Sequence, residues 1–415
     1  MTRSKFTAVA LGAVAAFIAA CPAGASAKAT GSTVDVWTWA PIGAVNGDSP
    51  QASAGIKSAF RYLNSTTGIG KDHHRVAVKV CATQITPTSE TQCAQQAAND
   101  PKAIAIVAPI TILATQVVAD IAQKAGLAVI NPAASDLGVA STAINYPMAT
   151  EYLNTAGCAV MMSRALKTKD VGFANTIIPA AQAGIAAAIS AAKRAKLNVV
   201  GQVQYPITTT DVTPFVQQMA DKKPKFVVLS SSPQGVGAWI AAAARLGVSV
   251  PICVGDRLIP PVVLRGLGSV ANRFYVASSY PDVGWKGFPL LATFRKQAKA
   301  EADGGNKAAA LTPTNNTEDV LIGWLSGQAV AQAASKVSGG LTRAKLHSAL
   351  NRTTVTLGTG EGALLPPIDF SKPNRNSKFP RLFNTKMFLK KWDASKKTFV
   401  LAPNVDPVFG DRLVK

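Results

Sequence analysis

The sequence is poor in acidic residues, in histidine and in groups that could assemble a catalytic or metal site. It contains 22 Asp and Glu residues and 3 His among 415 residues. The histidines are an adjacent pair, His73 and His74, and a lone His347, and none has a Cys or second His at ligand spacing. The pattern therefore predicts no metal site. No Ser/His/Asp set, paired carboxylates or cofactor motif is found, so we expect neither an enzyme nor a bound cofactor.

The sequence also lacks an apolar run that is long enough to span a membrane. The N-terminal run is too short for a comfortable span, and no other stretch is long enough. Residues 1–27 are typical of a secretory signal peptide: a basic start, an apolar stretch, and Ala25-Ser26-Ala27 as the cleavage site. Ile18-Ala19-Ala20-Cys21 also resembles the bacterial lipobox, in which the Cys is lipidated, although Pro22 is unfavourable for that processing. Both alternatives predict an exported protein, periplasmic or at the cell surface, and cleavage after Ala27 is favoured.

Cysteine is sparse, with five residues, and four of them remain after cleavage at either place. Four cysteines in an exported chain suggest disulfides. Cys81 and Cys93 flank one strand-to-helix loop and are the expected pair, which would contribute about 3 kcal/mol through chain entropy. Cys158, on a predicted helix, and Cys253, on a predicted strand, could pair or remain buried thiols.

Basic residues are abundant, and the formal net charge is +21. They are distributed along the chain, with no basic helix interleaved with aromatics and no nucleic-acid motif, so no nucleic-acid partner is predicted. A cationic surface that meets an anionic cell envelope explains this charge more simply than an anionic ligand does.

Strand and helix patterns alternate throughout the sequence. In residues 103–135 an apolar strand, a turn, a helix and a second strand form a βαβ unit, which makes the two strands parallel. Breaks in the alternation near residues 144–147, 279–282 and 358–367 indicate three crossings between two Rossmann-like α/β lobes with mostly parallel sheets. The expected lobes are residues 34–146 plus 282–362 and residues 147–281 plus 363–415. Ligands of such sheets lie beyond the carboxyl ends of the strands, where Thr111 and Ser135 stand.

Three short motifs strengthen this interpretation. Gly68-Ile69-Gly70 follows the first helix, Ala108-Pro109-Ile110-Thr111-Ile112 is similar to a G-P-x-S-S loop, and Ile130-Asn131-Pro132-Ala133-Ala134-Ser135 is similar to I-S-P-x-A-S/T. With the order of elements, they resemble the type I periplasmic binding proteins, specifically the branched-chain amino acid (leucine/isoleucine/valine) receptors of ABC transporters. The resemblance implies a monomer that binds a small molecule between its lobes and presents it to permease subunits.

The resemblance also implies a set of ligand-binding residues. Thr111, Ala133 and Ser135 would contact the ligand from the first lobe, with Asp48 on the same wall. From the second lobe the turn at residues 231–234 would close over it. Each has a plainer alternative: Thr111 and Ser135 as strand-end caps, Asp48 as a turn residue.

The second lobe departs from the family pattern. Gln234 stands where the family has the acidic residue that receives an amino acid's ammonium group, although Gln234 could simply begin its helix. Asp256 could substitute for that acid, or form a surface ion pair with Arg257. Without a carboxylate there, an ammonium group would be poorly paired. The ligand is therefore expected to be an amino acid, an amide or a small carboxylate. A ligand sensor for a signalling partner is the alternative function.

Overall fold

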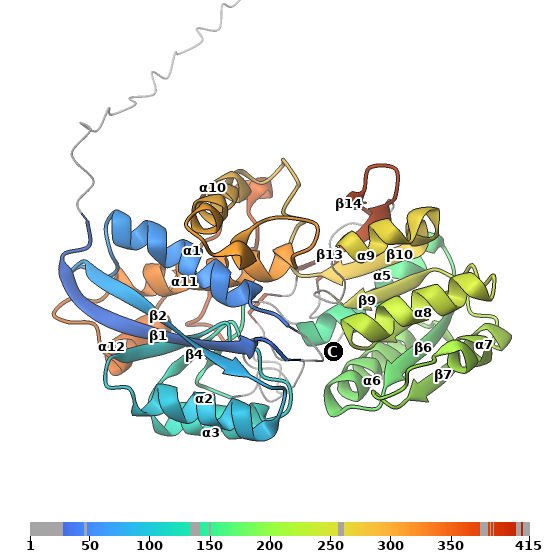
Figure 1. Ribbon diagram of the computed structural model, residues 1–415, viewed down its shortest axis with the longest axis horizontal. Coiled ribbons are helices and arrows are strands. Elements are labelled where there is room, and N and C mark those ends of the chain that lie inside the picture. The colour runs from blue at the N-terminus through green and yellow to red at the C-terminus, as the bar shows by residue number, and fades with distance from the viewer. Residues whose placement is uncertain are drawn as a thin grey trace, which may run out of the picture.

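The computed structural model describes residues 28–44, 48–132, 142–148, 151–255, 261–373, 381, 383–384, 386–403 and 408–409. Two lobes lie side by side along the long axis of the molecule, and each contains a sheet covered by helices (Figure 1). This arrangement confirms the predicted α/β class with mostly parallel sheets. Within the ranges just given, no helix is long and apolar enough to cross a membrane.

The first lobe contains a five-stranded sheet in the order β2-β1-β3-β4-β5, with every pair parallel. Its strands are β1 (Gly31–Pro41), β2 (His74–Thr83), β3 (Ala103–Val107), β4 (Ala128–Ile130) and β5 (Asn145–Tyr146). Its helices are α1 (Gln51–Ser65), α2 (Pro87–Asn99), α3 (Thr115–Lys124), α10 (Pro289–Asp303), α11 (Thr317–Ala334) and α12 (Arg343–Leu350). A short antiparallel pair, β11 (Thr354–Val355) with β12 (Ile368–Asp369), completes the lobe.

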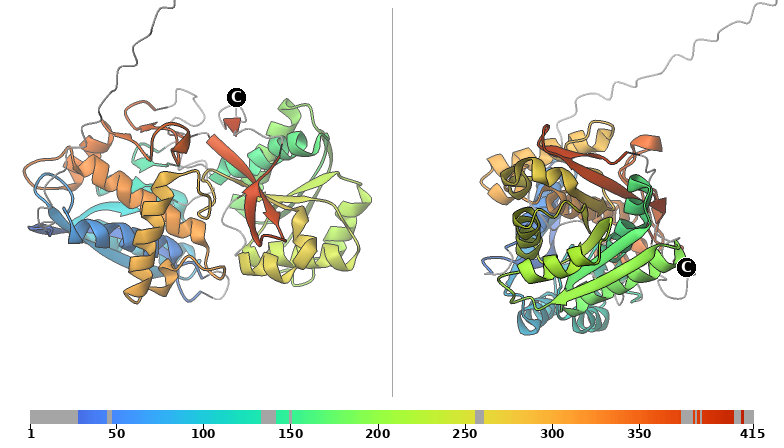
Figure 2. Two further views of the ribbon diagram at one scale, coloured as in Figure 1. Left: turned by 90° about the horizontal axis from the view of Figure 1, so that it is seen from above. Right: turned by 90° about the vertical axis from the view of Figure 1, so that its right-hand side faces the viewer.

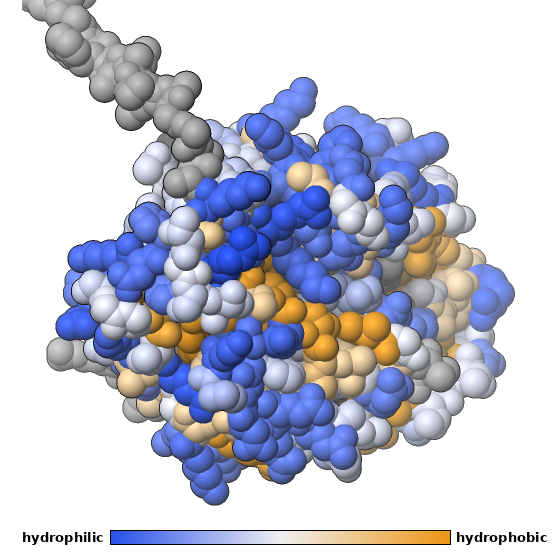
Figure 3. Space-filling view, turned by 60° about the vertical axis from the view of Figure 1, so that its left-hand side comes forward, coloured by the Kyte–Doolittle hydropathy of each residue, from blue (hydrophilic) through white to orange (hydrophobic). Residues whose placement is uncertain are grey.

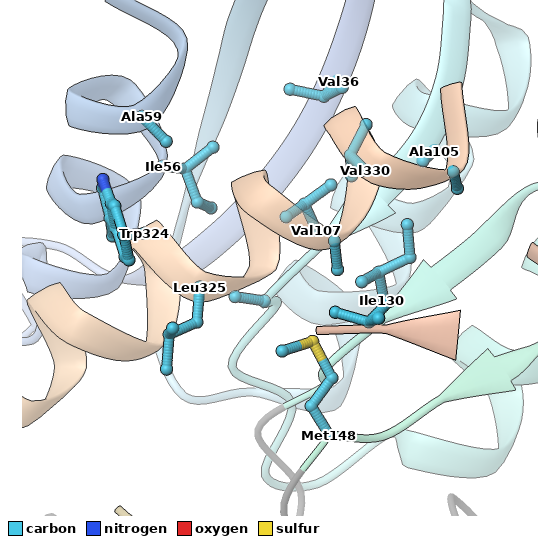
Figure 4. Packing of buried hydrophobic residues seen from close by; sticks show 14 of the residues in the cluster. Val36, Ile56, Ala59, Ala105, Val107, Ile130, Met148, Trp324, Leu325 and Val330 are labelled. Atoms are coloured by element: carbon cyan, nitrogen blue, oxygen red, sulfur yellow. The ribbon is translucent and has the colours of Figure 1, made fainter. Parts of the chain in front are cut away.

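The sheet of the first lobe buries both of its faces, as its continuous apolar strands predict. Val36 and Val107 pack with α1 and α11 on one face (Figure 4), and Trp39 packs with α2 and α3 on the other. Helices α1 and α11 touch closely, because a Cβ on Gly323 would lie 1.9 Å from the carbonyl oxygen of Ala52. The surface on this side of the molecule is mostly hydrophilic, with a band of apolar residues across its middle (Figure 3).

The second lobe contains a larger sheet in the order β14-β13-β10-β9-β8-β6-β7, with β15 paired to β13. Its strands are β6 (Asp170–Thr176), β7 (Asn198–Tyr205), β8 (Phe226–Ser230), β9 (Ile252–Gly255), β10 (Phe274–Ser278), β13 (Lys386–Asp393), β14 (Thr398–Leu401) and β15 (Val408–Phe409). Its helices are α5 (Glu151–Leu166), α6 (Pro179–Arg194), α7 (Thr213–Asp221), α8 (Pro233–Arg245) and α9 (Pro261–Gly266). Strands β6 to β10 are parallel, whereas β13 runs antiparallel to β10 and β14.

The chain passes between the lobes after β5, after β10, and between β12 and β13 (Figure 2). The last passage lies later than the boundary expected at residue 362. Leu364, Leu365 and Ile368 are buried in the core of the first lobe, and Phe383 packs against the same core. Their apolar side chains are the physical reason: the segment interpreted as a linker is part of a hydrophobic core.

Each lobe holds one disulfide. Cys81 of β2 is bonded to Cys93 of α2, which confirms the predicted pair. Cys158 of α5 is bonded to Cys253 of β9 across 95 residues of sequence, so the alternative of two free thiols is wrong. Both disulfides join a strand to a helix that covers it.

Polar contacts hold the crossings together. Asn131, which follows β4 with a φ of 50°, accepts a hydrogen bond from the backbone N–H of Met148 on the first crossing at 3.0 Å. Its amide nitrogen donates to the Tyr280 hydroxyl on the second crossing at 3.3 Å. One buried side chain therefore contacts two of the three connections.

A buried ion pair also joins the lobes. Lys390 of β13, 2% exposed, lies 2.8 Å from the carboxylate of Glu318 in the first turn of α11. The other oxygen of Glu318 accepts from the Ser278 hydroxyl at the end of β10, at 2.5 Å. Glu318 belongs to the first lobe, whereas Lys390 and Ser278 belong to the second, so this cluster bridges them.

Candidate functional site

The carboxyl ends of both parallel sheets face the boundary between the lobes. Strand β5 runs into the first crossing and β10 into the second, and all strands parallel to them end at the same edge of their sheet. The loops after β1 and β3 therefore face those after β6, β7 and β8 (Figure 1). This is the position at which open α/β sheets bind ligands.

The loop after β3 is held from within the first lobe. Glu90 of α2, 1% exposed, accepts hydrogen bonds from the backbone N–H groups of Ile112, Leu113 and Ala114 at 2.7 to 3.0 Å. One buried carboxylate thus occupies three backbone donors of the loop. Sequence reasoning missed Glu90, because nothing in its local pattern separates it from a solvated helix residue.

Thr111 lies in the middle of this loop and is 4% exposed. Its hydroxyl oxygen accepts a hydrogen bond from the indole N–H of Trp39 at 3.0 Å. The hydroxyl proton remains for donation to another group. Thr111 is therefore fixed in orientation by the buried Trp39 of β1.

Asp48 is exposed in the loop after β1 and accepts a hydrogen bond from the backbone N–H of Gly43 at 2.9 Å. That contact is the turn chemistry given above as its plainer alternative. The neighbouring Ser49 donates to the Asp319 carboxylate of α11 at 3.1 Å, which anchors this loop to the first lobe.

The other expected residues are placed less directly. Gln234 is exposed in the first turn of α8, and the side chain of Ser232 caps that helix by accepting from the N–H of Gly235 at 3.2 Å. Ala133, Ser135 and Asp256 lie outside the described residues. Across the ranges that are described, no group of His, Cys, Asp and Glu is placed to hold a metal ion.

A row of three hydroxyl groups stands at the facing edge of the second lobe. Thr176, Tyr205 and Ser231, at the ends of β6, β7 and β8, are 2%, 1% and 6% exposed. Thr176 pairs in register with Tyr205, and Ser231 follows the residue of β8 that pairs with Asn175. Because side chains alternate along strands, the three hydroxyls lie on one face of the sheet. Among the described residues, none of the three hydroxyls has a hydrogen-bond partner of normal geometry, although the Tyr205 and Ser231 hydroxyls lie near each other.

The row is neutral and rich in hydrogen-bonding capacity. Burial raises the pKa of the Tyr205 phenol, an effect that the nearby Ser231 hydroxyl partly offsets, so Tyr205 stays protonated at neutral pH. A buried hydroxyl without a partner costs about 1–3 kcal/mol, which favours occupation of the row by a polar group. Exposed apolar side chains adjoin the same edge: Ile177 after β6 and Ile207 after β7.

Sequence reasoning could have found this row. Tyr205 ends a strand predicted at residues 199–205, Thr176 and Ser231 stand two residues after strands predicted at 171–174 and 226–229, and period-2 alternation places the three on one face. The family resemblance points only to the turn at residues 231–234, and Thr176 and Tyr205 are not among the residues it implies. A hydroxyl at the carboxyl end of three successive strands was the available signal.

Two α/β lobes, joined by three crossings and facing each other with their carboxyl edges, define a two-lobed ligand-binding architecture. The family model for periplasmic binding proteins matches residues 42–394. The chain belongs to the periplasmic binding protein family, which confirms the resemblance drawn from its motifs. Among curated proteins, none matches the sequence.

Solved structures share this fold over nearly the whole chain. A possible leucine/isoleucine/valine-binding protein from Rhodopirellula baltica has a TM-score of 0.72 at 13% identity, covering 94% of this chain and 100% of that one. A branched-chain amino acid ABC transporter structure from Thermus thermophilus with bound valine gives 0.73 at 15%, covering 92% and 98%. A fatty acid ABC transporter substrate-binding protein from Thermomonospora curvata gives 0.73 at 16%, covering 93% and 95%.

Proposed function

We propose that the protein is the extracytoplasmic solute-binding component of an ABC importer and is not an enzyme. It would bind a small molecule between the two facing sheet edges and present it to permease subunits. The observation that carries the proposal is the row formed by Thr176, Tyr205 and Ser231. Membership of the periplasmic binding protein family supports export of the protein, either through the signal sequence or with a lipid on Cys21. It also supports the proposal that the protein acts as a monomer.

The chemistry of the two edges supports a ligand with a polar head and an apolar body. Thr111 offers a fixed hydroxyl donor from the first lobe, and the row of the second lobe adds neutral hydroxyls. Ile177 and Ile207 are 49% and 51% exposed beside that row and would cover an apolar body. An amino acid, an amide or a carboxylate meets these requirements. Among the similar structures named above, one has valine bound and another is a fatty acid ABC transporter substrate-binding protein.

A ligand screen by thermal unfolding tests this function. Amino acids, their amides, aromatic acids and medium-chain carboxylic acids are added to the mature protein one at a time. The true ligand at about a hundred times its dissociation constant should raise the free energy of unfolding by about 2.7 kcal/mol. Small-angle scattering should show a smaller radius of gyration with that ligand, because the lobes close on it. A compound that stabilises the protein without compaction would contradict binding between the lobes.

A further inference from the structure

Nine basic residues of the second lobe gather at the edge of its sheet that lies away from the first lobe. Three connections lead from a helix back to a strand there: residues 167–169, 195–197 and 222–225. They contain six lysines and no acidic residue, and all six lysines are exposed: Lys167, Lys169, Lys196, Lys222, Lys223 and Lys225. Beside the exposed Asp221 that ends α7, the ends of the preceding helices add three more exposed cations, Arg164, Lys193 and Arg194. We call these nine residues the cationic pole.

The nine cations lie side by side. Strand β6 pairs with both β7 and β8, so the three connections that begin these strands are neighbours. The backbone N–H of Asn198 donates to the carbonyl of Lys169 at 2.9 Å, and that of Lys225 donates to Asp170 at 3.0 Å. Neighbouring strands are about 4.8 Å apart, which concentrates the positive charge on one end of the lobe. The basic residues are therefore distributed along the sequence, but the fold brings these nine together in space.

The matching connections of the first lobe show that the fold does not require this charge. Residues 66–73, 100–102 and 125–127 lead from α1, α2 and α3 to the next strand. They contain two lysines and two aspartates, Lys71, Lys102, Asp72 and Asp100. Their formal charge is zero, against six positive charges in the second lobe.

Backbone conformation adds an independent argument. Lys167, Lys196 and Lys223 each follow a helix with φ between 51° and 55°, a left-handed conformation that glycine adopts without strain. At the same position after α3 and α8 stand Gly126 and Gly247, both with φ of 66°. The second lobe thus retains lysine three times where glycine would be less strained. Favourable interaction of cations with helix C-termini explains part of this, but not the lysines that directly precede strands, Lys169 and Lys225.

We propose that the cationic pole docks the protein on an anionic phospholipid surface. Seven of the nine cations are lysines, which bind phosphate as point charges without a fixed geometry. The three connections contain no aromatic residue, so they offer no stacking platform for nucleic-acid bases and no wedge for insertion into the bilayer. The charges come from the ends of adjacent elements rather than from a groove, which suits a broad surface. Docking there leaves the facing edges of the two lobes uncovered.

Vesicle co-sedimentation of the mature protein tests the proposal. Vesicles of phosphatidylcholine with about 30% phosphatidylglycerol should bind it at about 0.05 M NaCl and release it at about 0.5 M, because salt screens the attraction. Vesicles of phosphatidylcholine alone should not bind it. Equal binding to both kinds of vesicle would overturn the proposal. So would binding to a soluble anionic polymer without binding to the anionic vesicles.

A triple variant locates the interaction. Lys167→Gly, Lys196→Gly and Lys223→Gly remove three charges at positions where glycine fits, so the melting temperature should not fall. Each lysine near an anionic membrane contributes about fivefold, so the partition coefficient should fall roughly a hundredfold. The matched control, Lys102→Gln, Lys124→Gln and Lys397→Gly, removes the same charge from exposed positions elsewhere and should bind as the wild type does. Equal losses of vesicle binding in both variants would show that the net charge of the protein, and not the cationic pole, causes the binding. The test needs no small ligand, so its failure leaves the solute-binding proposal unaffected.

Discussion

The two lobes share a plan but differ at the edges that face each other. In the first lobe most polar groups of the edge are paired internally: Glu90 holds the loop after β3 and Trp39 holds Thr111, while the Thr83 hydroxyl at the end of β2 has no described partner. In the second lobe Thr176, Tyr205 and Ser231 are buried, and no described residue is a partner of normal geometry for their hydroxyls. The first lobe thus presents a preorganised surface, and the second presents polar groups that a ligand or ordered water would satisfy.

This difference indicates which lobe a ligand should stabilise more. Preorganised groups change little on binding, since their orientation is already fixed. Buried groups without partners gain a full hydrogen bond, because the unbound state leaves them unsatisfied. We therefore expect a ligand to stabilise the second lobe more than the first. Three variants sharpen or break this comparison.

Removal of the disulfides should produce the largest effect. The double variant Cys158→Ala, Cys253→Ala opens a loop of 95 residues in the second lobe and should lower the free energy of unfolding by about 4.7 kcal/mol. Cys81→Ala, Cys93→Ala opens a loop of 12 residues in the first lobe and should cost about 3 kcal/mol. Urea unfolding followed by fluorescence measures both values. An equal or larger loss for the first-lobe pair would contradict the ranking.

Replacement of Glu90 tests whether the first edge is held from within. Glu90→Ala leaves the N–H groups of Ile112, Leu113 and Ala114 without their acceptor and should cost about 3 kcal/mol. Amide hydrogen exchange should accelerate at these three residues and stay unchanged in the second lobe. Glu301→Ala, another buried acid in the same lobe, is the control, and it should leave exchange in the loop unaltered. Unchanged exchange at residues 112–114 in Glu90→Ala would show that the loop does not depend on Glu90.

Single hydroxyl deletions should have the smallest and most discriminating effects. Tyr205→Phe removes a group without a described partner of normal geometry, so the unliganded protein should be as stable as the wild type or slightly more stable. Thr111→Val leaves the Trp39 N–H unpaired and should cost about 1–2 kcal/mol without ligand. With ligand, Tyr205→Phe should weaken affinity about fivefold to tenfold, the value of one hydrogen bond. Thermal unfolding measures the stability of the unliganded variants, and calorimetric titration measures their affinity for the ligand. Loss of stability in unliganded Tyr205→Phe would show that the hydroxyl is already satisfied.

Much of the fold could be predicted because its signals are local. The apolar run at residues 103–107 predicts a strand, and β3 has the same bounds, since a short apolar run between turn residues has few alternatives. The helical pattern predicts a helix at residues 180–195, whereas α6 spans Pro179–Arg194; a difference of one residue at each end is usual for helix termini. The resemblance to a family with a fixed order of elements then supplied the two-lobed arrangement.

The remainder depends on contacts that a pattern does not contain. Strand β5 has two residues and forms only because β4 offers its edge, so its sequence was interpreted as a break. The last crossing was expected too early in the sequence. Residues 364–369 (LLPPID) have the composition of a linker, but Leu364 and Leu365 are buried in the core of the first lobe. Within the candidate site, Glu90 gained its importance from a loop 22 residues away, a distance that no local motif spans.

The ion pair between Lys390 and Glu318 constrains the motion of the two lobes. A rotation that pulled these charges apart would leave a buried ammonium group uncompensated, at a cost of several kcal/mol. A rotation whose axis passes near the pair would keep it intact while the distant rims separate widely. The lobes should therefore swing about a pivot at β13 and the start of α11, and a spectroscopic distance probe should report little movement there and much at the loops after β3 and β8.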